Sequence, residues 1–335
     1  MTSTKLQQRP LGSTGQTVTP IGIGGAYLGM RREDGNHTVD EDLGAAAILH
    51  ALDLGINLID TSAGYMGGGR SEKIVGQALT QWLADGGSRD TIVVETKTGT
   101  RDGRDRTEAA YSARATWESI ETSLRSLNLE YLDVALVHDP MDLEPVLAPD
   151  GAWSALQEMK SQGLVRAIGL GTRSHEQHRR MIETGACDVC LTHSDFQLIR
   201  QEARAGVLEP AARHGVAVLN GTALAHGMLL GERPPTEVVG GLPDRWRAAI
   251  KRRPGFRMEL DRAQALYDWA DARQVSLLAL NLLYIAREPH IAATLLGAST
   301  PAQIEIDVAA LTEELPEATW RELETDMPWL ARDGG

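Results

Sequence analysis

The chain contains few cysteines and few aromatic residues. Only two of its 335 residues are cysteines and 4% are Phe, Trp or Tyr, whereas 42% are hydrophobic. So few cysteines exclude a disulfide framework and indicate a reducing cytoplasm. The hydrophobic fraction is large enough for a sizeable core, which the low aromatic content predicts to consist mainly of Leu, Ile, Val and Ala.

Positive charge is scarce relative to negative charge. The 33 Lys and Arg and the 46 Asp and Glu give a formal net charge of −13, which argues against nucleic acid or an anionic membrane as the main partner. No apolar run approaches the ~20 residues of a membrane helix. The N-terminus, MTSTKLQQRPLG, lacks the apolar core of a signal peptide. We therefore expect a cytoplasmic monomer or homodimer that acts on a small molecule.

Two phosphate-binding motifs are incomplete. A dinucleotide fingerprint G-x-G-x-x-G that starts at Gly22 has Tyr27 in place of its third glycine, which argues against a Rossmann domain. A Walker-like stretch from Gly64 to Ser71 has Arg70 where the phosphate-binding lysine should stand. Neither a Rossmann nucleotide site nor an NTPase is therefore expected.

The candidate metal-binding and redox residues have no further ligands near them in the sequence. His175 and His178 are three positions apart in a predicted helix without further ligands nearby, so we expect an exposed polar face and no metal. Cys187 and Cys190 have C-x-x-C spacing but lie in an apolar strand-like run without a second pair. A structural role for both cysteines is favoured.

Short apolar runs alternate with helical segments along most of the chain. After a predicted hairpin (RPLG, turn STGQ, TVTP) come eight strand candidates: IGIG, NLID, TIVVETK, YLDVALVH, LVRAIGLG, CDVCLTH, VAVLNG and IAATLLG. Helices such as SEKIVGQALTQWL, with Ser71 as a plausible N-cap, lie between them. This alternation predicts a parallel sheet buried on both faces. Eight units favour a closed (β/α)8 TIM barrel, as one domain over residues 1–335, over an open doubly wound sheet.

Two stretches depart from this pattern. Residues 222–255 contain Pro234, Pro235, Pro243 and Pro254, and are predicted to form an excursion loop. The final stretch MPWLARDGG is predicted to be a surface segment. We expect the excursion loop and the tail after residue 314 to line a substrate pocket.

Four polar residues stand at the C-terminal ends or exit loops of three successive predicted strands: Asp60, Tyr65, Lys97 and His138. In a barrel this end of the strands carries the active site. A phenol with a pKa near ~10 is a poor acid or base at neutral pH, but a nearby ammonium lowers that pKa. A carboxylate would hold the ammonium, and an imidazole could steer a substrate oxygen. The set suits proton transfer to or from a carbonyl or alcohol oxygen.

The chain resembles the aldo-keto reductase superfamily from RPLGSTGQTVTPIGIGG to PAQIEID. GINLIDTSAGYMGGGRSEKIVGQAL resembles its Asp–Tyr segment, TIVVETKTG its lysine strand, and SLRSLNLEYLDVALVHDP its histidine strand. The resemblance implies a (β/α)8 barrel that binds an extended nicotinamide cofactor without a Rossmann domain. It also implies that Tyr65 is the general acid/base and that Lys97 lowers the pKa of Tyr65. Asp60 would be the partner of the lysine, and His138 would orient the carbonyl.

The same resemblance implies cofactor contacts. NADP-preferring relatives often place Lys or Arg after the last strand, where this chain has GASTPAQIEID with Glu305 and Asp307 and no basic residue. NAD is therefore favoured over NADP, unless another loop supplies a cation such as Arg233 or Arg252. The expected cofactor contacts are Gly25, Thr172, Ser194, Asn220, Gly221, Gly227, Met228, Leu229, Gly297, Ser299, Gln303 and Asp307.

The substrate expectation rests on one triplet. His138-Asp139-Pro140 resembles the subgroup with NAD-dependent aldose 1-dehydrogenases and pyridoxal 4-dehydrogenases. A carboxylate beside the histidine suits a polyhydroxylated substrate, although Asp139 could equally cap the following loop. The expected substrate residues are Tyr27, Tyr65, His138 and Asp139.

The leading hypothesis is therefore NAD-dependent oxidation of a sugar hemiacetal to a lactone. NAD(P)H-dependent reduction of a small aldehyde or ketone and oxidation of pyridoxal are alternatives within the same chemistry. A non-catalytic barrel that binds the cofactor is an alternative of a different class.

Overall fold

The computed structural model describes residues 6–33, 36–100, 106–242, 247–248 and 251–330. The chain divides into two compact units. The first comprises Met1–His193, Ala203–Thr222 and Pro289–Ile304, and the second comprises Ser194–Glu202, Ala223–Glu288 and Glu305–Gly335.

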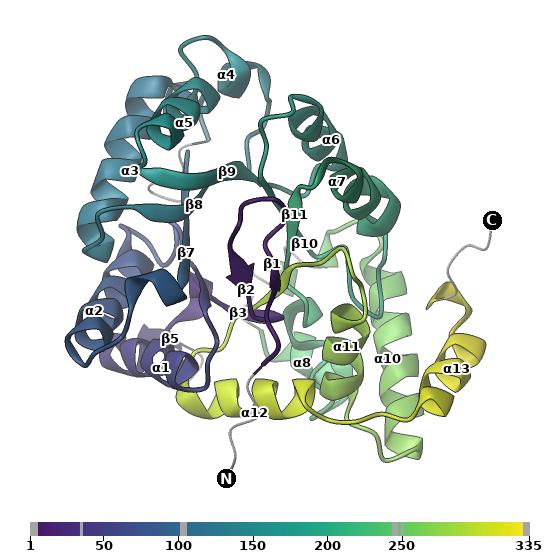
Figure 1. Ribbon diagram of the computed structural model, residues 1–335. Coiled ribbons are helices and arrows are strands. Elements are labelled where there is room, and N and C mark those ends of the chain that lie inside the picture. The colour runs from purple at the N-terminus through teal and green to yellow at the C-terminus, as the bar shows by residue number, and fades with distance from the viewer. Residues whose placement is uncertain (1–5, 34–35, 101–105, 243–246, 249–250, 331–335) are drawn as a thin grey trace. The chain divides into compact units, whose positions relative to one another are not determined.

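The first unit contains a closed parallel barrel (Figure 1). Its strands follow the order β3-β6-β7-β8-β9-β10-β11-β12, and β12 pairs with β3. Their bounds are β3 Ile21–Gly24, β6 Leu58–Asp60, β7 Val93–Thr98, β8 Leu132–His138, β9 Val165–Gly171, β10 Val189–His193, β11 Ala217–Gly221 and β12 Ala293–Leu296. Each corresponds to one of the strands predicted from short apolar runs. The predicted (β/α)8 barrel is confirmed.

Aliphatic side chains fill the barrel. Alternate residues of neighbouring strands, among them Leu58, Val93 and Leu136, form one buried cluster. The N-terminal hairpin of β1 (Arg9–Pro10) and β2 (Thr17–Val18) crosses the centre of the barrel in Figure 1 and contributes to this cluster. Residues two apart on a strand share a face. The polar residues two positions after Leu58 and Val93 therefore also face the interior of the barrel.

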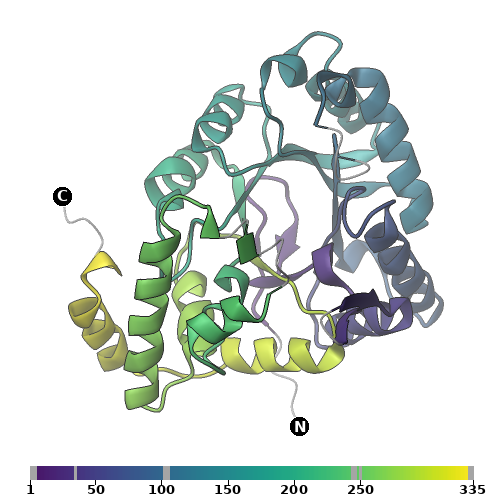
Figure 2. The same ribbon diagram turned by 180° about the vertical axis from the view of Figure 1, so that it is seen from behind.

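Helices of the first unit lie outside the barrel strands that they connect, and Figure 2 shows them from behind. The helices of the first unit are α1 Glu41–Asp53, α2 Arg70–Ala84, α3 Ala113–Leu127, α4 Glu144–Leu147, α5 Ala152–Ser161, α6 His175–Glu183 and α7 Glu209–His214. Polar N-caps begin several of them: the side chain of Asp40 accepts from Leu43 N at 2.9 Å at the start of α1. Such caps satisfy backbone donors that the first turn leaves unpaired.

Two local predictions in these helices are wrong. Helix α2 begins at Arg70 after Gly69, so Ser71 lies within the first turn and donates its hydroxyl to Gly25 O at 2.8 Å. His178 is fully buried and its Nε2 lies 2.9 Å from Thr172 O, because its position on α6 faces the barrel and not solvent. The two histidines therefore do not form one exposed polar face.

A short antiparallel hairpin was also not predicted. It consists of β4 (Met30–Glu33) and β5 (Asn36–Val39), with Met30 opposite Val39. Its strands contain charged and polar residues, so the apolar alternation that indicates a half-buried strand is absent.

The second unit is helical. It contains α8 Pro235–Gly240, α10 Phe256–Ala272, α11 Leu277–Ala286 and α13 Glu317–Asp326, and α12 (Pro301–Leu311) follows the last barrel strand. The predicted excursion loop thus includes a helix, α8. The predicted surface tail is also wrong in part: Met327 and Leu330 are buried in the core of this unit, and Trp329 Nε1 donates to Leu198 O at 2.9 Å. No helix of the described residues is long and apolar enough to span a membrane.

Candidate active site

Three adjacent strands carry the predicted catalytic residues. Asp60 ends β6, Lys97 is the penultimate residue of β7, and His138 ends β8. Because β6 pairs with β7 and β7 with β8, the side chains meet at the C-terminal end of the barrel. Tyr65 lies in the loop after β6. The structure therefore brings all members of the predicted quartet together.

A tight turn positions Tyr65. Its backbone N–H donates to Ser62 O at 3.0 Å, and Met66 and the glycines that follow it have positive φ angles before α2 begins. Gly64 passes so close to Thr100 O that a Cβ at this position would clash with it. The loop therefore depends on glycine, which pays no steric penalty in either situation.

Lys97 is the centre of the site and is 1% exposed. Its Nζ donates to Asp60 Oδ1 and, at 2.9 Å, to Thr61 O. The same nitrogen lies 4.9 Å from the centroid of the Tyr65 ring. A buried ammonium is costly unless it is paired and hydrogen-bonded, so these partners explain how β7 can hold a lysine inside the barrel.

A second carboxylate contacts this lysine. Glu95 Oε1 lies 3.2 Å from Lys97 Nζ, and Glu95 is fully buried directly opposite Asp60 in the strand register. Sequence reasoning missed Glu95, although its spacing from Lys97 in TIVVETK was an available signal, because residues two apart on a strand share a face.

Burial dominates the pKa of Tyr65. It raises this pKa above its ordinary value, and the charge of Asp60 raises it further. The charge of Lys97 lowers the pKa of Tyr65, as expected, but this contribution is smaller. The net pKa is raised because burial removes the hydration of the phenolate and the carboxylate of Asp60 opposes the ammonium.

His138 packs edge-on against Tyr65, with ring centroids 5.7 Å apart and an interplanar angle of 83°. Its Nδ1 lies 2.7 Å from Thr100 Oγ1 and 3.2 Å from Ser62 Oγ, and Tyr111 donates its hydroxyl to His138 O at 2.9 Å. Burial, followed by the charge of Lys97, lowers the pKa of His138 to about 3. The imidazole is therefore neutral at neutral pH.

Charged residues surround Asp139, which follows the histidine with a φ of 45°. Arg106 Nη2 lies 2.9 Å from Asp139 Oδ2, and His193 Nε2 lies 3.6 Å from Asp139 Oδ1. Burial would raise the pKa of Asp139, but hydrogen bonding to His193 and the charge of Arg106 lower it to about 2. Asp139 is thus an ionised group beside His138. Arg106 was not anticipated from the sequence.

Tyr27 and two glycines occupy the ends of β3 and β12. A Cβ on Gly25 would lie 2.7 Å from Asp60 O, so only glycine allows this backbone to approach β6. A Cβ on Gly297 would lie 3.1 Å from Tyr27 Cδ2, which places the Tyr27 ring beside the exit of β12. Burial raises the pKa of Tyr27 to about 12.

Several residues of the first unit that we expect to contact the cofactor form hydrogen bonds to other residues of the chain. Thr172 donates its hydroxyl to Gln177 Oε1 at 3.2 Å, and Gln303 Oε1 accepts from Ser299 N at 2.7 Å. Asn220 is fully buried in β11, next to Gly221. These contacts fix the loops after β9 and β12, so the side chains of Thr172 and Gln303 have structural partners in addition to any cofactor.

The expected cofactor residues of the second unit differ in character. Met228 and Leu229 are buried in its hydrophobic core, so only their backbone could contact a ligand. Gly227 and Ser194 have positive φ angles of 91° and 65°. Asp307 is 7% exposed, and burial raises its pKa to about 7.

Two arginines of this unit contact one buried carboxylate. Arg253 forms an ion pair with the buried Glu259, and Arg200 contacts the same carboxylate at 2.5 Å. Glu259 therefore holds both guanidinium groups, although its single charge balances only one of them. Arg233 and Arg252, the cations considered from the sequence, have exposed side chains.

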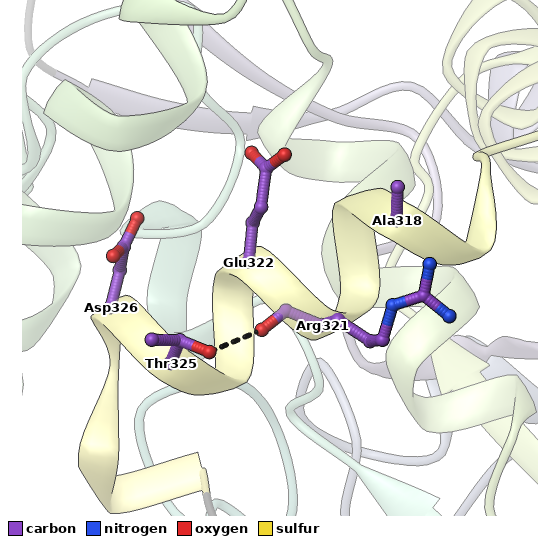
Figure 3. A pocket seen from close by; sticks show the side chains of 5 residues that line it. All are labelled: Ala318, Arg321, Glu322, Thr325 and Asp326. Carbon is purple, nitrogen blue, oxygen red and sulfur yellow. Dashed lines mark hydrogen bonds between the residues drawn. The ribbon is translucent and has the colours of Figure 1, made fainter.

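Other features carry no comparable chemistry. The depression on α13 in Figure 3 is lined by exposed residues of a single helix, and its Thr325 Oγ1 donates to Arg321 O at 2.7 Å. Cys187 and Cys190 are buried free thiols with sulfurs 4.0 Å apart. Within the described ranges, no group of three His, Cys, Asp or Glu residues could hold a metal ion.

Comparisons with known proteins agree with this geometry. The NADH-specific methylglyoxal reductase of Escherichia coli is 28% identical over 93% of this chain and 96% of its own length. The L-galactose dehydrogenase of Arabidopsis thaliana is 29% identical over 92% of this chain and 89% of its own. A crystal structure from Pseudomonas aeruginosa, described as that of an aldo-keto reductase, superposes with a TM-score of 0.63 at 26% identity and covers 91% of this chain and 95% of that one. The model of the Aldo/keto reductase family matches residues 20–325, and the chain therefore belongs to this family.

Proposed function

We propose that this NAD(P)-dependent oxidoreductase oxidises the C1 hemiacetal of an aldose to the lactone, with NAD as the acceptor and Tyr65 as the general base. The observation that carries the proposal is the buried contact of Lys97 with Asp60 beside the Tyr65 ring, next to a neutral His138. This arrangement offers one group that can accept a proton and one that can donate a hydrogen bond to the same oxygen.

The protein groups divide the proton chemistry between them. Oxidation would break the C1–H and O–H bonds of the substrate and form C=O. The hydroxyl proton would pass to the phenolate of Tyr65, which Lys97 stabilises, and a bound nicotinamide would take up the hydride. We infer that Thr100 donates its hydroxyl to Nδ1 of His138, which leaves the hydrogen of the neutral ring on Nε2 for the substrate oxygen.

Asp307 supports NAD as the cofactor. It is a buried carboxylate on α12, in a segment from Gly297 to Asp307 that has no basic residue. Such a carboxylate can accept from ribose hydroxyls but would repel a 2′-phosphate. The nicotinamide, when bound, accepts or supplies the hydride, and the protein provides orientation and electrostatics. The NADH-specific relative is consistent with this preference.

The polar residues beside His138 support a polyhydroxylated substrate. Asp139, Arg106 and His193 form a linked group that includes both a hydrogen-bond acceptor and donors. A ring of hydroxyls can bond to both kinds of group. The L-galactose dehydrogenase relative favours the same substrate class.

Reduction of a small aldehyde or ketone is the second candidate, because the methylglyoxal reductase relative has a similar overall identity. Pyridoxal oxidation is a further alternative. Initial rates with L-galactose and L-fucose, each with NAD and NADP, should be compared with rates on methylglyoxal with NADH and NADPH. Our proposal predicts the highest kcat/KM for an aldose with NAD. A higher value for methylglyoxal would favour the reductase, and tight NAD binding without turnover in this panel would favour a non-catalytic barrel.

A further inference from the structure

Glu95 belongs to the buried charge cluster at the base of the active site. Its Oε1 is 3.2 Å from Lys97 Nζ, and its backbone is paired in register with that of Asp60. Lys97 thus lies between two carboxylates, one from β6 and one from its own strand. Proton transfer by a tyrosine and a single Asp–Lys pair does not require this additional acid.

Two carboxyl groups and one ammonium are electrically neutral only if one of the carboxyl groups is protonated. With Asp60 and Glu95 both ionised, Lys97 would leave one uncompensated negative charge in a site that excludes water. Neighbouring carboxylates in such a site share a proton, since two like charges in a low-dielectric environment repel strongly. Burial and the charge of Asp60 raise the pKa of Glu95 well above its usual range, against the opposing effect of Lys97. Glu95 is therefore the group that holds the additional proton.

We propose that Glu95 is a positioning residue for proton transfer: as a neutral acid it contacts Lys97 without adding a second negative charge beside Tyr65. This inference rests on the proposed role of Tyr65 as the base. If Glu95 lost its proton, a second negative charge would oppose formation of the phenolate. Ionisation of Glu95 and ionisation of Tyr65 therefore compete.

The groups that face Glu95 define this competition. Asp60 from β6, Lys97 from β7 and Tyr65 from the following loop are its charged or titratable neighbours. The interior face of β8 contributes Val134 and Leu136, which are apolar. Another buried acid, Glu72 of α2, accepts from the side chain of Thr96, whose position on β7 alternates with those of Glu95 and Lys97. Glu72 therefore contacts the opposite face of the strand.

Glu95→Gln is the direct test, because an amide reproduces the neutral acid and cannot ionise. The alkaline titration of Tyr65 should be followed by tyrosinate absorbance in the near ultraviolet, with Tyr65→Phe subtracted to isolate this residue. We expect Tyr65 in Glu95→Gln to ionise about one pH unit lower than in the unmodified protein. The kcat/KM for L-galactose with NAD at neutral pH should fall far less in Glu95→Gln than in Tyr65→Phe, because the amide keeps the shape and the neutral state of the acid. Glu72→Gln is the matched control, and its Tyr65 titration should not move.

Two results would overturn the inference. One is an unchanged Tyr65 titration in Glu95→Gln. The other is a loss of activity in Glu95→Gln as large as that in Tyr65→Phe, because Glu95 would then act as an ionised carboxylate. Glu95→Met provides a second variant if the amide does not fold, and it too should lower the pH at which Tyr65 ionises. The absorbance titration needs no turnover, so it tests Glu95 even if Tyr65→Phe retains activity and the proposed base is wrong.

Discussion

Thr100 Oγ1 lies 2.7 Å from Nδ1 of His138, closer than Ser62 Oγ at 3.2 Å. The contact joins the exit of β7 to the end of β8. A neutral imidazole has one hydrogen, so the partner of Nδ1 decides which nitrogen can donate to a substrate. If the threonine hydroxyl donates, Nε2 keeps its hydrogen.

Thr100→Val should therefore weaken catalysis without changing the shape of the site. We expect kcat/KM for the aldose to fall about tenfold, the equivalent of one lost hydrogen bond, because the required tautomer is no longer fixed. The effect should fall on kcat more than on KM. Thr98→Val, two residues earlier at the end of β7, is the matched control. Equal rates for both variants would show that Thr100 does not select the tautomer.

The titration of His138 provides a second prediction. Its folded pKa of about 3 lies below the ordinary 6.5, so its contribution to stability is complete above about pH 6.5 and is lost progressively as pH falls towards about 3. The ring should stay neutral between about pH 5 and pH 8. NMR of labelled histidines, with His138→Asn to identify the signal, should show a flat chemical shift over that interval. A midpoint near 6.5 would contradict the burial argument.

We predict that Asp307 couples cofactor binding to pH. Burial raises its pKa to about 7, whereas ribose hydroxyls that donate to the carboxylate would favour the ionised form. NAD affinity should therefore increase as pH rises towards about 7 and level off above it. Calorimetric Kd values over this range should show that dependence, and Asp307→Asn should abolish it. The same pH dependence in the variant would remove Asp307 from the cofactor site.

Asp139→Asn separates the two substrate classes. The substitution keeps the shape of the side chain but removes the charge that pairs with Arg106 and His193. We expect KM for an aldose to rise about tenfold, because hydrogen bonds to an ionised group are worth about 1.5–3 kcal/mol. Turnover of methylglyoxal, which has no ring of hydroxyls, should change little. Equal effects on both substrates would indicate that Asp139 stabilises the conformation of the loop and does not bind the substrate.

The barrel could be predicted because its signal is local. Each strand is a short apolar run followed by a helix, and the residues at the strand ends converge by topology alone, as Asp60, Lys97 and His138 do. The hairpin of β4 and β5 has no such signal, since its strands are polar. The buried positions of Met327 and Leu330 depend on contacts with residues distant in sequence.

The electrostatics of the site were less predictable than its membership. Pairwise reasoning predicts that Lys97 lowers the pKa of Tyr65, and this contribution is present. The net direction depends on the complete burial of the ring, which only the packed barrel shows. The type and spacing of residues therefore predict which side chains lie close together in the site. Their protonation states depend on how completely folding removes them from water.

The central claim is that Tyr65 transfers the proton in an NAD-linked oxidation, and Tyr65→Phe tests it most directly. The substitution removes only the hydroxyl, so NAD affinity should be retained while kcat/KM for L-galactose falls by about 10²–10⁴-fold, the range of general acid–base catalysis. Undiminished oxidation by Tyr65→Phe would contradict the account.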